Sequence, residues 1–410
     1  MAMIRPFKAL RPAAEAAATV SAVPYDVVNT GEAKELAAGN ALSFLHVSRP
    51  EIDLPDGTDP YSDEVYARAK ENFESLKRAA PLTVETEPCL YVYRLQMGDH
   101  SQVGIAACCS IDEYTGGVIK KHERTRRDKE DDRTRHMLAI SAQTGPVFLT
   151  YRGRAEIGEM AAKTQESGPL YDFTAPDSIR HTMWRVSGND AAAMIEAFES
   201  VPAIYIADGH HRAASASRAR DVLREAKAGH RGGEEYNFFL AVLFTADEVQ
   251  IFPYNRVVKD LNGITRLQFL DALARQFEVS ASAPPRPAEK GRISMRLGNE
   301  WYSLSLLAET TKPLGPIASL DVSVLQDRVL DPLLGIQDIR TDKRVDFVGG
   351  IRGPEELERM VADGRAAVAF SMYPVSLDEL MAISDADEIM PPKSTWFEPK
   401  LRDGLLSHLI

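Results

Sequence analysis

The chain has 410 residues, of which 44% are hydrophobic and 26% are charged. This composition is typical of a globular protein and argues against a disordered or fibrous chain, and the length favours more than one structural unit. Lys and Arg number 48 against 60 Asp and Glu, and the resulting net charge of −12 disfavours a broad surface for nucleic acid. Any affinity for phosphate should therefore be local.

The N-terminal residues are interrupted by charge and proline before an apolar stretch develops, so they do not resemble a signal peptide. The longest apolar run, 238–244, is far shorter than the roughly 20 residues of a membrane helix. The cysteines, Cys89, Cys108 and Cys109, form neither a spaced set of metal ligands nor a disulfide framework. We therefore expect a cytoplasmic protein with no membrane partner.

The first part of the chain, to about residue 88, combines turn signals with two predicted helices. From residue 89 the pattern changes to strands, and a charged stretch then leads into a helix that ends near residue 143. The helices are predicted at 32–38, 64–80 and 190–198, and the strands at 89–97, 102–111, 117–121, 147–151 and 181–186.

A short apolar run, 203–207, predicts a buried strand, Asp-Gly predicts a tight turn, and the Ala-rich segment to about residue 227 predicts a helix. The Pro-rich segment 281–289 is the best candidate for a linker or long loop. The remaining strands are predicted at 238–245, 249–253, 293–297, 301–306 and 366–372, and the remaining helices at 322–333, 354–363 and 377–386. Because strands and helices alternate irregularly, we predict a mixed α+β fold. Its main domain would span 1–280, followed by an α+β region at 281–410 with a lid-like tail.

The turn after the strand at 203–207 carries the densest group of residues that can bind a ligand or transfer a proton. Asp208 precedes Gly209, and His210, His211 and Arg212 then stand at or near a helix N-terminus. Free N–H groups and the helix dipole favour anions there, and an arginine can grip phosphate or carboxylate with two hydrogen bonds. The carboxylate could bind Mg²⁺ or accept a proton from a substrate hydroxyl. The structural alternatives are an Asx-turn or helix cap for the aspartate, core positions for the histidines and a surface ion pair for the arginine.

A second cluster, 121–125, closes an apolar strand. Side-chain alternation would place Lys121, Glu123 and Thr125 on one face. A carboxylate framed by cations keeps a low pKa, so unless it is partly desolvated Glu123 would serve as a charged ligand more readily than as a base. The structural alternative is a solvated run of charges.

Two weaker signals lie far apart in the chain. Pro24-Tyr25-Asp26 is a turn with a carboxylate, either structural or in contact with a ligand. Segment 390–400 combines rigid prolines with Lys393, Ser394 and Thr395, which are good donors to phosphate, but it has no glycine-rich cradle. A tail that folds over the site or over the body of the protein explains this segment equally well.

The sequence lacks the His-Glu-x-x-His motif of zinc peptidases, a spaced cysteine-pair motif and the Gly-x-Ser-x-Gly nucleophile elbow of hydrolases. His122-Glu123 could in principle bind a transition metal together with His210-His211, but these pairs lie on separate elements.

Four motifs together resemble the DUF1015 family. They are Pro-Tyr-Asp-Val at 24–27, Lys-His-Glu-Arg-Thr at 121–125, Ala-Asp-Gly-His-His-Arg at 207–212, and Pro-Pro-Lys-Ser-Thr-x-Phe-x-Pro-Lys ending at residue 400. The Asp-Gly-His-His-Arg turn also resembles the phosphate-binding box of the ParB and sulfiredoxin superfamily, which includes nucleotide-dependent kinases of free serine. This resemblance implies a ParB/sulfiredoxin-like core, with Asp208 near the phosphoryl acceptor or metal, His210, His211 and Arg212 on the phosphate, and Glu123 as a separate catalytic acid.

We therefore predict a nucleotide-dependent phosphotransferase that acts on a small hydroxyl substrate, with free L-serine as the specific candidate. The cofactors would be ATP or ADP and Mg²⁺, the metal at Asp208. The predicted catalytic residues are Glu123, Asp208 and His211. The residues predicted to bind phosphate or nucleotide are Lys121, His122, Arg124, Thr125, Gly209, His210, Arg212, Lys393, Ser394 and Thr395.

Two other functions stay open at this point. One is a nucleotide- or phosphometabolite-binding regulatory module without turnover, and the other is a metal-dependent hydrolase. We expect no nucleic-acid partner, because no basic helix-turn-helix segment is present. The sequence leaves open whether the chain forms a homo-oligomer.

Overall fold

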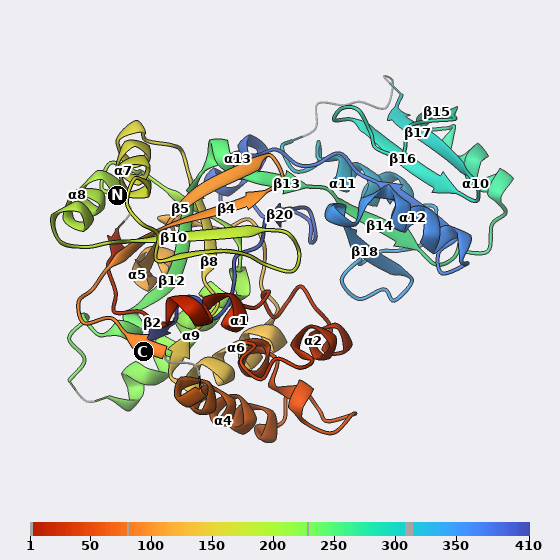
Figure 1. Cartoon of the computed structure of the whole chain (residues 1–410). Helices are drawn as coiled ribbons and strands as arrows, with labels where there is room; N and C mark the ends of the chain where they lie inside the picture. The colour runs from red at the N-terminus through yellow and green to blue at the C-terminus, as the bar shows by residue number, and fades with distance from the viewer. Residues whose placement is uncertain (1–2, 80–81, 228, 308–314) are drawn as a thin grey trace. The chain divides into compact units, whose positions relative to one another are not determined.

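The chain forms two compact units in the computed structural model, which describes residues 3–79, 82–227, 229–307 and 315–410 (Figure 1). Unit 1 comprises Met1–Lys121, Thr125–Val249 and Pro399–Ile410, and unit 2 comprises His122–Arg124 and Gln250–Glu398. Helices and sheets occur in both units, so the predicted mixed α+β class is confirmed. The compact units divide at Val249, whereas the two domains expected from the sequence meet at residue 280. That domain division stays a prediction.

Unit 1 is built on a mixed sheet with the strand order β6-β11-β8-β12-β5-β4-β10-β9, and β1 pairs with β5. The pairs β11–β6 and β12–β8 are parallel, and the other pairs of this sheet are antiparallel. Its strands are β1 (Ile4–Arg5), β4 (Leu90–Met97), β5 (His100–Ser110), β6 (Ile119–Lys120), β8 (Val147–Tyr151), β9 (Tyr171–Thr174), β10 (Arg180–Val186), β11 (Ile204–Asp208) and β12 (Phe238–Thr245).

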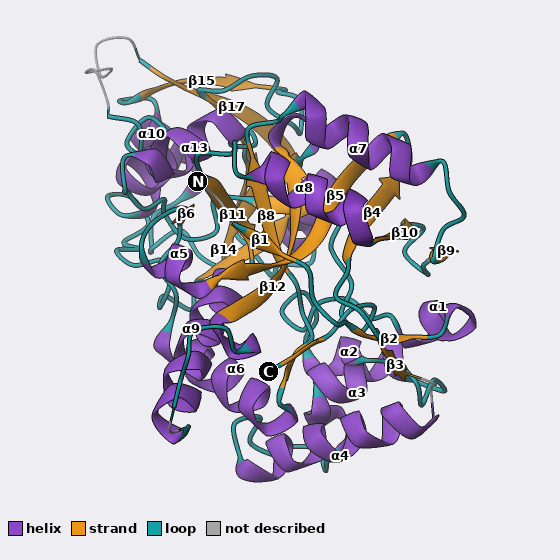
Figure 2. Cartoon of the chain, turned by 90° about the vertical axis from the view of Figure 1, so that its left-hand side faces the viewer, coloured by secondary structure: helices purple, strands orange, loops and turns teal. Residues whose placement is uncertain are grey.

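The central strand β12 is buried at six successive positions, which is typical of a strand covered on both faces of its sheet. One face packs against helices α7, α8 and α9 through a large apolar core. Figure 2 shows α7 and α8 side by side. Helix α6 packs against α9, and α4 packs against α6. The helices of this unit are α1 (Ala17–Val20), α2 (Thr30–Ala37), α3 (Leu45–Ser48), α4 (Asp63–Ala79), α5 (Ile111–Thr115), α6 (Arg127–Ile140), α7 (Ala155–Gln165), α8 (Gly188–Phe198) and α9 (His210–Ala226).

Short strand pairs attach the ends of the chain to unit 1. Strand β2 (Leu10–Pro12) pairs with β3 (Leu82–Val84), and β21 (His408–Leu409) pairs with β7 (Ala142–Gln143). Segment 399–410 therefore belongs to the same unit as the N-terminal half of the chain. This return of the chain brings residues of the last predicted motif back to unit 1.

Unit 2 contains a sheet with the order β15-β17-β16-β19-β14-β18 and a separate pair, β13–β20. Its strands are β13 (Gln250–Phe252), β14 (Tyr254–Val258), β15 (Phe277–Ala281), β16 (Arg292–Leu297), β17 (Glu300–Leu306), β18 (Val345–Gly349), β19 (Val368–Ser371) and β20 (Trp396–Glu398). Its helices are α10 (Arg266–Leu273), α11 (Asp321–Leu325), α12 (Gly353–Ala362) and α13 (Leu377–Asp385). The Pro-rich segment 281–289 is the connection from β15 to β16, so it is a loop inside this unit.

Candidate functional site

The turn between β11 and α9 positions the residues that the sequence singles out. The run Ile204–Ala207 is fully buried in the sheet, and Gly209 then has a φ of 95°, a left-handed conformation that glycine adopts without strain. The N–H of Ala213 donates to the carbonyl oxygen of Gly209, so α9 begins at once. The N–H groups of the first turn have no partner within the helix, and they favour an anion together with the helix dipole.

Asp208, at the end of β11, forms an ion pair with Lys400. The ammonium Nζ donates to Oδ2 of the carboxylate at 3.0 Å, and both side chains are largely shielded from solvent. Burial opposes ionisation, but the charges of Lys400, Arg212 and His210 outweigh it and lower the pKa of Asp208. The carboxylate is therefore ionised at neutral pH, and it suits the binding of charge more than the abstraction of a proton.

Arg212 turns its guanidinium back across Gly209 into the interior, where its side chain is 8% exposed. Its Nη1 donates to the carbonyl oxygen of Pro146 at 2.6 Å, and its Nη2 lies 3.3 Å from the carboxylate of Asp26. The nearby carboxylates of Asp26, Asp208 and Asp403 raise the pKa of this guanidinium although burial opposes its charge. Arg212 is thus a permanent buried cation with some of its donors already used.

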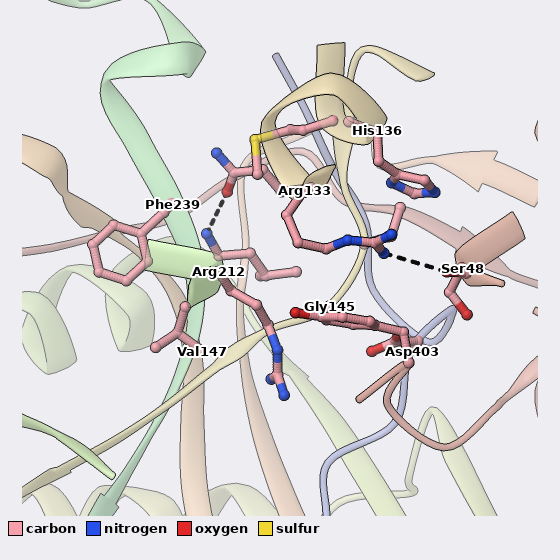
Figure 3. A pocket seen from close by; sticks show the side chains of 14 residues that line it. Ser48, Arg133, His136, Gly145, Val147, Arg212, Phe239 and Asp403 are labelled. Atoms are coloured by element: carbon pink, nitrogen blue, oxygen red, sulfur yellow. Dashed lines mark hydrogen bonds between the residues drawn. The ribbon is translucent and has the colours of Figure 1, made fainter. Parts of the chain in front are cut away.

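A small cavity of about 40 Å³ lies beside this guanidinium, and Figure 3 shows Arg133, Arg212 and Asp403 among the side chains that line it. Asp403 is 2% exposed, and burial raises its pKa to about 7 although Arg212 and Arg133 oppose the shift. The volume is enough for a water molecule or a small polar group. A carboxyl that changes charge near neutral pH therefore adjoins the candidate anion site.

A larger cavity of about 170 Å³ is also present in unit 1, and it shares Tyr25, Arg133 and His136 with the smaller one. The guanidinium of Arg133 lies 4.1 Å from the ring centroid of Tyr25, a cation–π contact. The Tyr66 hydroxyl donates to Asp132 at 2.9 Å. This mixture of rings and charges of both signs could hold a small polar molecule.

The two histidines of the turn have different surroundings. His210 is buried, and its charge contributes to the low pKa of Asp208. His211 is partly exposed, and its Nε2 accepts a hydrogen bond from the backbone N–H of Arg126 at 3.0 Å. This bond ties α9 to the segment that follows the charged cluster, and it sets which ring nitrogen of His211 can carry the proton.

A family model described as a protein of unknown function, DUF1015, matches residues 4–323. The chain belongs to the DUF1015 family. No curated protein matches it.

Solved structures that resemble this DUF1015 chain include a free serine kinase variant in complex with AMP, with 14% identity and a TM-score of 0.37 over 74% of this chain and 92% of that one. Others are a conserved hypothetical protein from Pyrococcus furiosus, with 15% identity and a TM-score of 0.35 over 74% and 94% of the two chains, and C-terminally truncated SbnI from Staphylococcus aureus, with 12% identity and a TM-score of 0.39 over 73% and 85%. At these values the likeness carries no argument about activity.

The other predicted site residues of the DUF1015 chain are divided between the two units. Lys121 and Thr125 belong to unit 1, whereas His122, Glu123 and Arg124 belong to unit 2. The ammonium of Lys121 lies 3.8 Å from the ring centroid of Tyr114, and burial lowers its pKa. The Thr125 hydroxyl donates to Glu130. The roles predicted for these residues in phosphate binding and catalysis stay predictions.

The predicted phosphate donors at 393–395 also belong to unit 2. The Ser394 hydroxyl donates to the carbonyl oxygen of Pro391 at 2.6 Å, and the backbone oxygen of Lys393 accepts from Arg256 at 3.0 Å. The first of these bonds occupies the hydroxyl hydrogen that the sequence argument assigned to phosphate.

Three residues near the turn have no place among the predicted site residues: Asp26, Lys400 and Asp403. The first two lie inside motifs that carry the family resemblance, Pro-Tyr-Asp-Val and the motif ending at residue 400, so a signal was present in the sequence. Their partners lie more than 180 positions away along the chain. Asp403 has no such motif, and only its burial identifies it.

Among the described residues, no group of three or more His, Cys, Asp or Glu side chains is arranged to hold a metal ion. Mg²⁺ usually keeps several waters and takes one or two carboxylates together with substrate phosphates. Asp208 fits that pattern as a single ligand only if a nucleotide supplies the other oxygens and Lys400 moves aside.

None of the helices that the structure describes has the length and apolar character needed to cross a membrane.

Proposed function

We propose that the chain is a nucleotide-dependent phosphotransferase that acts on a small hydroxyl substrate, with free L-serine as the specific candidate. The proposal rests on one observation, the juxtaposition in unit 1 of an ionised carboxylate, a buried guanidinium and the N-terminal turn of α9. Phosphoryl transfer requires mostly positioning and the neutralisation of phosphate charge, and these groups can supply both.

In this proposal the N–H groups at the start of α9, His210 and His211 bind phosphate oxygens of the nucleotide. Asp208 accepts a hydrogen bond from the substrate hydroxyl and orients its oxygen toward the phosphorus. A carboxylate with a lowered pKa is a weak base, but a loose transition state places little demand on proton removal before the bond to phosphorus forms. Glu123 remains the candidate for a separate catalytic acid.

Two ion pairs would have to adjust when the nucleotide binds. Lys400 holds the carboxylate of Asp208, and Asp26 holds one edge of the Arg212 guanidinium. An ammonium that leaves a carboxylate for a phosphate keeps a charged partner, so this exchange costs little electrostatic energy. Lys400 would then neutralise charge on the transferred group, a role that the sequence argument did not assign to it.

The test is to incubate the purified chain with ATP or ADP, Mg²⁺ and L-serine and to follow the phosphorus signals by ³¹P NMR. We expect a phosphomonoester of serine to accumulate. Replacement of Asp208 by Asn should slow its formation by about 100-fold or more, the usual contribution of one positioned group. Asp221→Asn is the matched control, because it makes the same chemical change on α9, the helix that follows the turn, at a side chain that is 59% exposed. The absence of a phosphorylated product from serine and from related small alcohols would refute the proposal.

A regulatory module that binds a nucleotide without turnover is the second candidate. The internal pairing of Asp208 with Lys400 and of Arg212 with Asp26 favours it, because both charges already have partners within unit 1. Thermal stabilisation by ATP or ADP that survives Asp208→Asn, with no product formed by the unmodified chain, would favour this function over the enzyme. The hydrolase alternative finds no support among the described residues, since they contain no suitable set of metal ligands.

A further inference from the structure

A separate cavity of about 250 Å³ lies in unit 2 and contains none of the residues discussed for catalysis. Its floor is one face of the strands β15, β17 and β16. Side chains of the Pro-rich connection from β15 to β16, including Pro284 and Pro287, line it as well. This volume is far above the roughly 10–15 Å³ that a single water needs, so the cavity has room for a small molecule.

The strand register explains why the floor is polar. Ser303 on β17 pairs with Ser280 on β15 and with Ser294 on β16, so three hydroxyls form one row across the sheet. In the next row, Ser305 on β17 stands between Glu278 and Arg292. Directly paired residues of antiparallel strands point to the same side, so all six side chains share one face.

The hydroxyl groups of this floor have no hydrogen-bond partner among the described residues of the protein. Ser294 is the most enclosed of them, with 2% of its surface exposed. Farther along the same face the polar atom of Trp301 is satisfied, because its Nε1 donates to Glu358 on α12 at 2.7 Å. Ser280 is exposed and Ser303 and Ser305 are partly exposed, so water can reach the row, and a ligand that binds here would replace this water with its own hydroxyl groups.

We propose that this cavity is a binding site for a small polyhydroxylated ligand, a polyol or monosaccharide. Each serine hydroxyl can donate one hydrogen bond and accept others, and ligand hydroxyls do the same. The charges oppose an anion, since Arg292 is paired with Glu289 at 2.9 Å and Glu278 occupies the other end of its row. The carboxylate and the guanidinium can instead bind further hydroxyls at the two ends. This site is independent of the phosphotransferase proposal.

The probes for the test are D-ribose, D-glucose and myo-inositol, added to the full chain and followed by saturation-transfer NMR. Two variants address the site. Ser303→Val removes the central hydroxyl, and Ser280→Trp on the exposed edge strand β15 fills the cavity without altering the core. Ser101→Val and Ser101→Trp are the matched controls, because Ser101 is exposed on strand β5 of unit 1.

We expect saturable binding of at least one probe, with a Kd that rises about tenfold in Ser303→Val, the usual effect of one lost hydrogen bond. Ser280→Trp should abolish the signal, and both Ser101 variants should retain it. The proposal is overturned if none of the three probes binds saturably or if the Ser101 variants lose binding to the same extent. Displacement of the bound probe by inorganic phosphate at lower concentration would also overturn it, because the site would then select anions.

Discussion

Asp403 offers the sharpest quantitative test of the candidate site. Its side chain is 2% exposed between the chain segments that carry Arg212, Arg133 and Asp26, and its pKa is raised to about 7 because burial disfavours the charged form. Asparagine has almost the same shape as a protonated aspartate but cannot ionise. Replacement of Asp403 by Asn therefore removes the titration and leaves the packing of the cavity in place.

The magnitude follows from the difference between the folded pKa of about 7 and the ordinary value of 3.8. Because the folded pKa is raised, the folded state holds the proton more tightly, so this group's contribution to stability is complete below pH 4 and is lost as the pH rises through 7. One pKa unit corresponds to about 1.4 kcal/mol, so the loss amounts to about 4 kcal/mol at pH 8. Asp403→Asn should be more stable than the unmodified chain by up to this amount at pH 8, and equally stable near pH 4.

Hydrogen exchange of the amides in β8 and β12 reports the opening free energy of unit 1 alone. At pH 8 we expect exchange in the variant to be slower by up to about a thousandfold, with the difference vanishing toward pH 4. Asp99→Asn, in the exposed turn between β4 and β5, serves as the control and should show no such trend. Parallel pH profiles for the unmodified chain and Asp403→Asn would refute the reasoning, because burial would then not dominate the ionisation of this carboxyl.

Gly209→Ala should destabilise unit 1 by about 1–2 kcal/mol, because a residue with a side chain is strained at a φ of 95°. The same hydrogen-exchange experiment measures this loss, and an unchanged opening free energy would contradict the prediction. Lys400→Gln should raise the pKa of Asp208, since the ammonium is the leading cause that lowers it, and carboxyl-carbon NMR would detect the shift or show that another cation is responsible. Cys108 and Cys109 should react with a thiol reagent only after unfolding, because burial raises their pKa values and excludes the reagent; rapid labelling under native conditions would be the contrary result.

The elements with strong local patterns could be predicted from the sequence. The apolar run at 238–245 forms β12, and the turn with its Asp-Gly pair joins β11 to α9. The strand expected at 117–121 is shorter, at Ile119–Lys120, because only these residues pair with β11. The helix expected at 322–333 ends as α11 at Leu325 and continues as a wider, π-helical turn. Local periodicity does not determine such ends, which depend on pairing and packing with distant segments.

The ion pairs within the candidate site could not be predicted from local sequence patterns. Helical and strand periods relate residues a few positions apart, whereas Asp26 contacts Arg212 and Lys400 contacts Asp208 across nearly half the length of the chain. The sequence shows that charged residues stand at the turn, but only the folded arrangement shows that these charges pair with each other. That pairing lowers the pKa of Asp208, so its carboxylate is a weaker base than an unpaired aspartate would be.

Completion of unit 1 has to wait for the synthesis of unit 2. Segment 399–410 supplies Lys400, Asp403 and strand β21 to unit 1, yet it follows residues 250–398 in the chain. At the usual 5–20 residues per second, the ribosome takes about 7–30 s to add that intervening stretch. During this interval the nascent sheet of unit 1 lacks the cation that neutralises Asp208. A chaperone that shields this sheet would therefore act in a defined period of translation, before residue 400 leaves the ribosome.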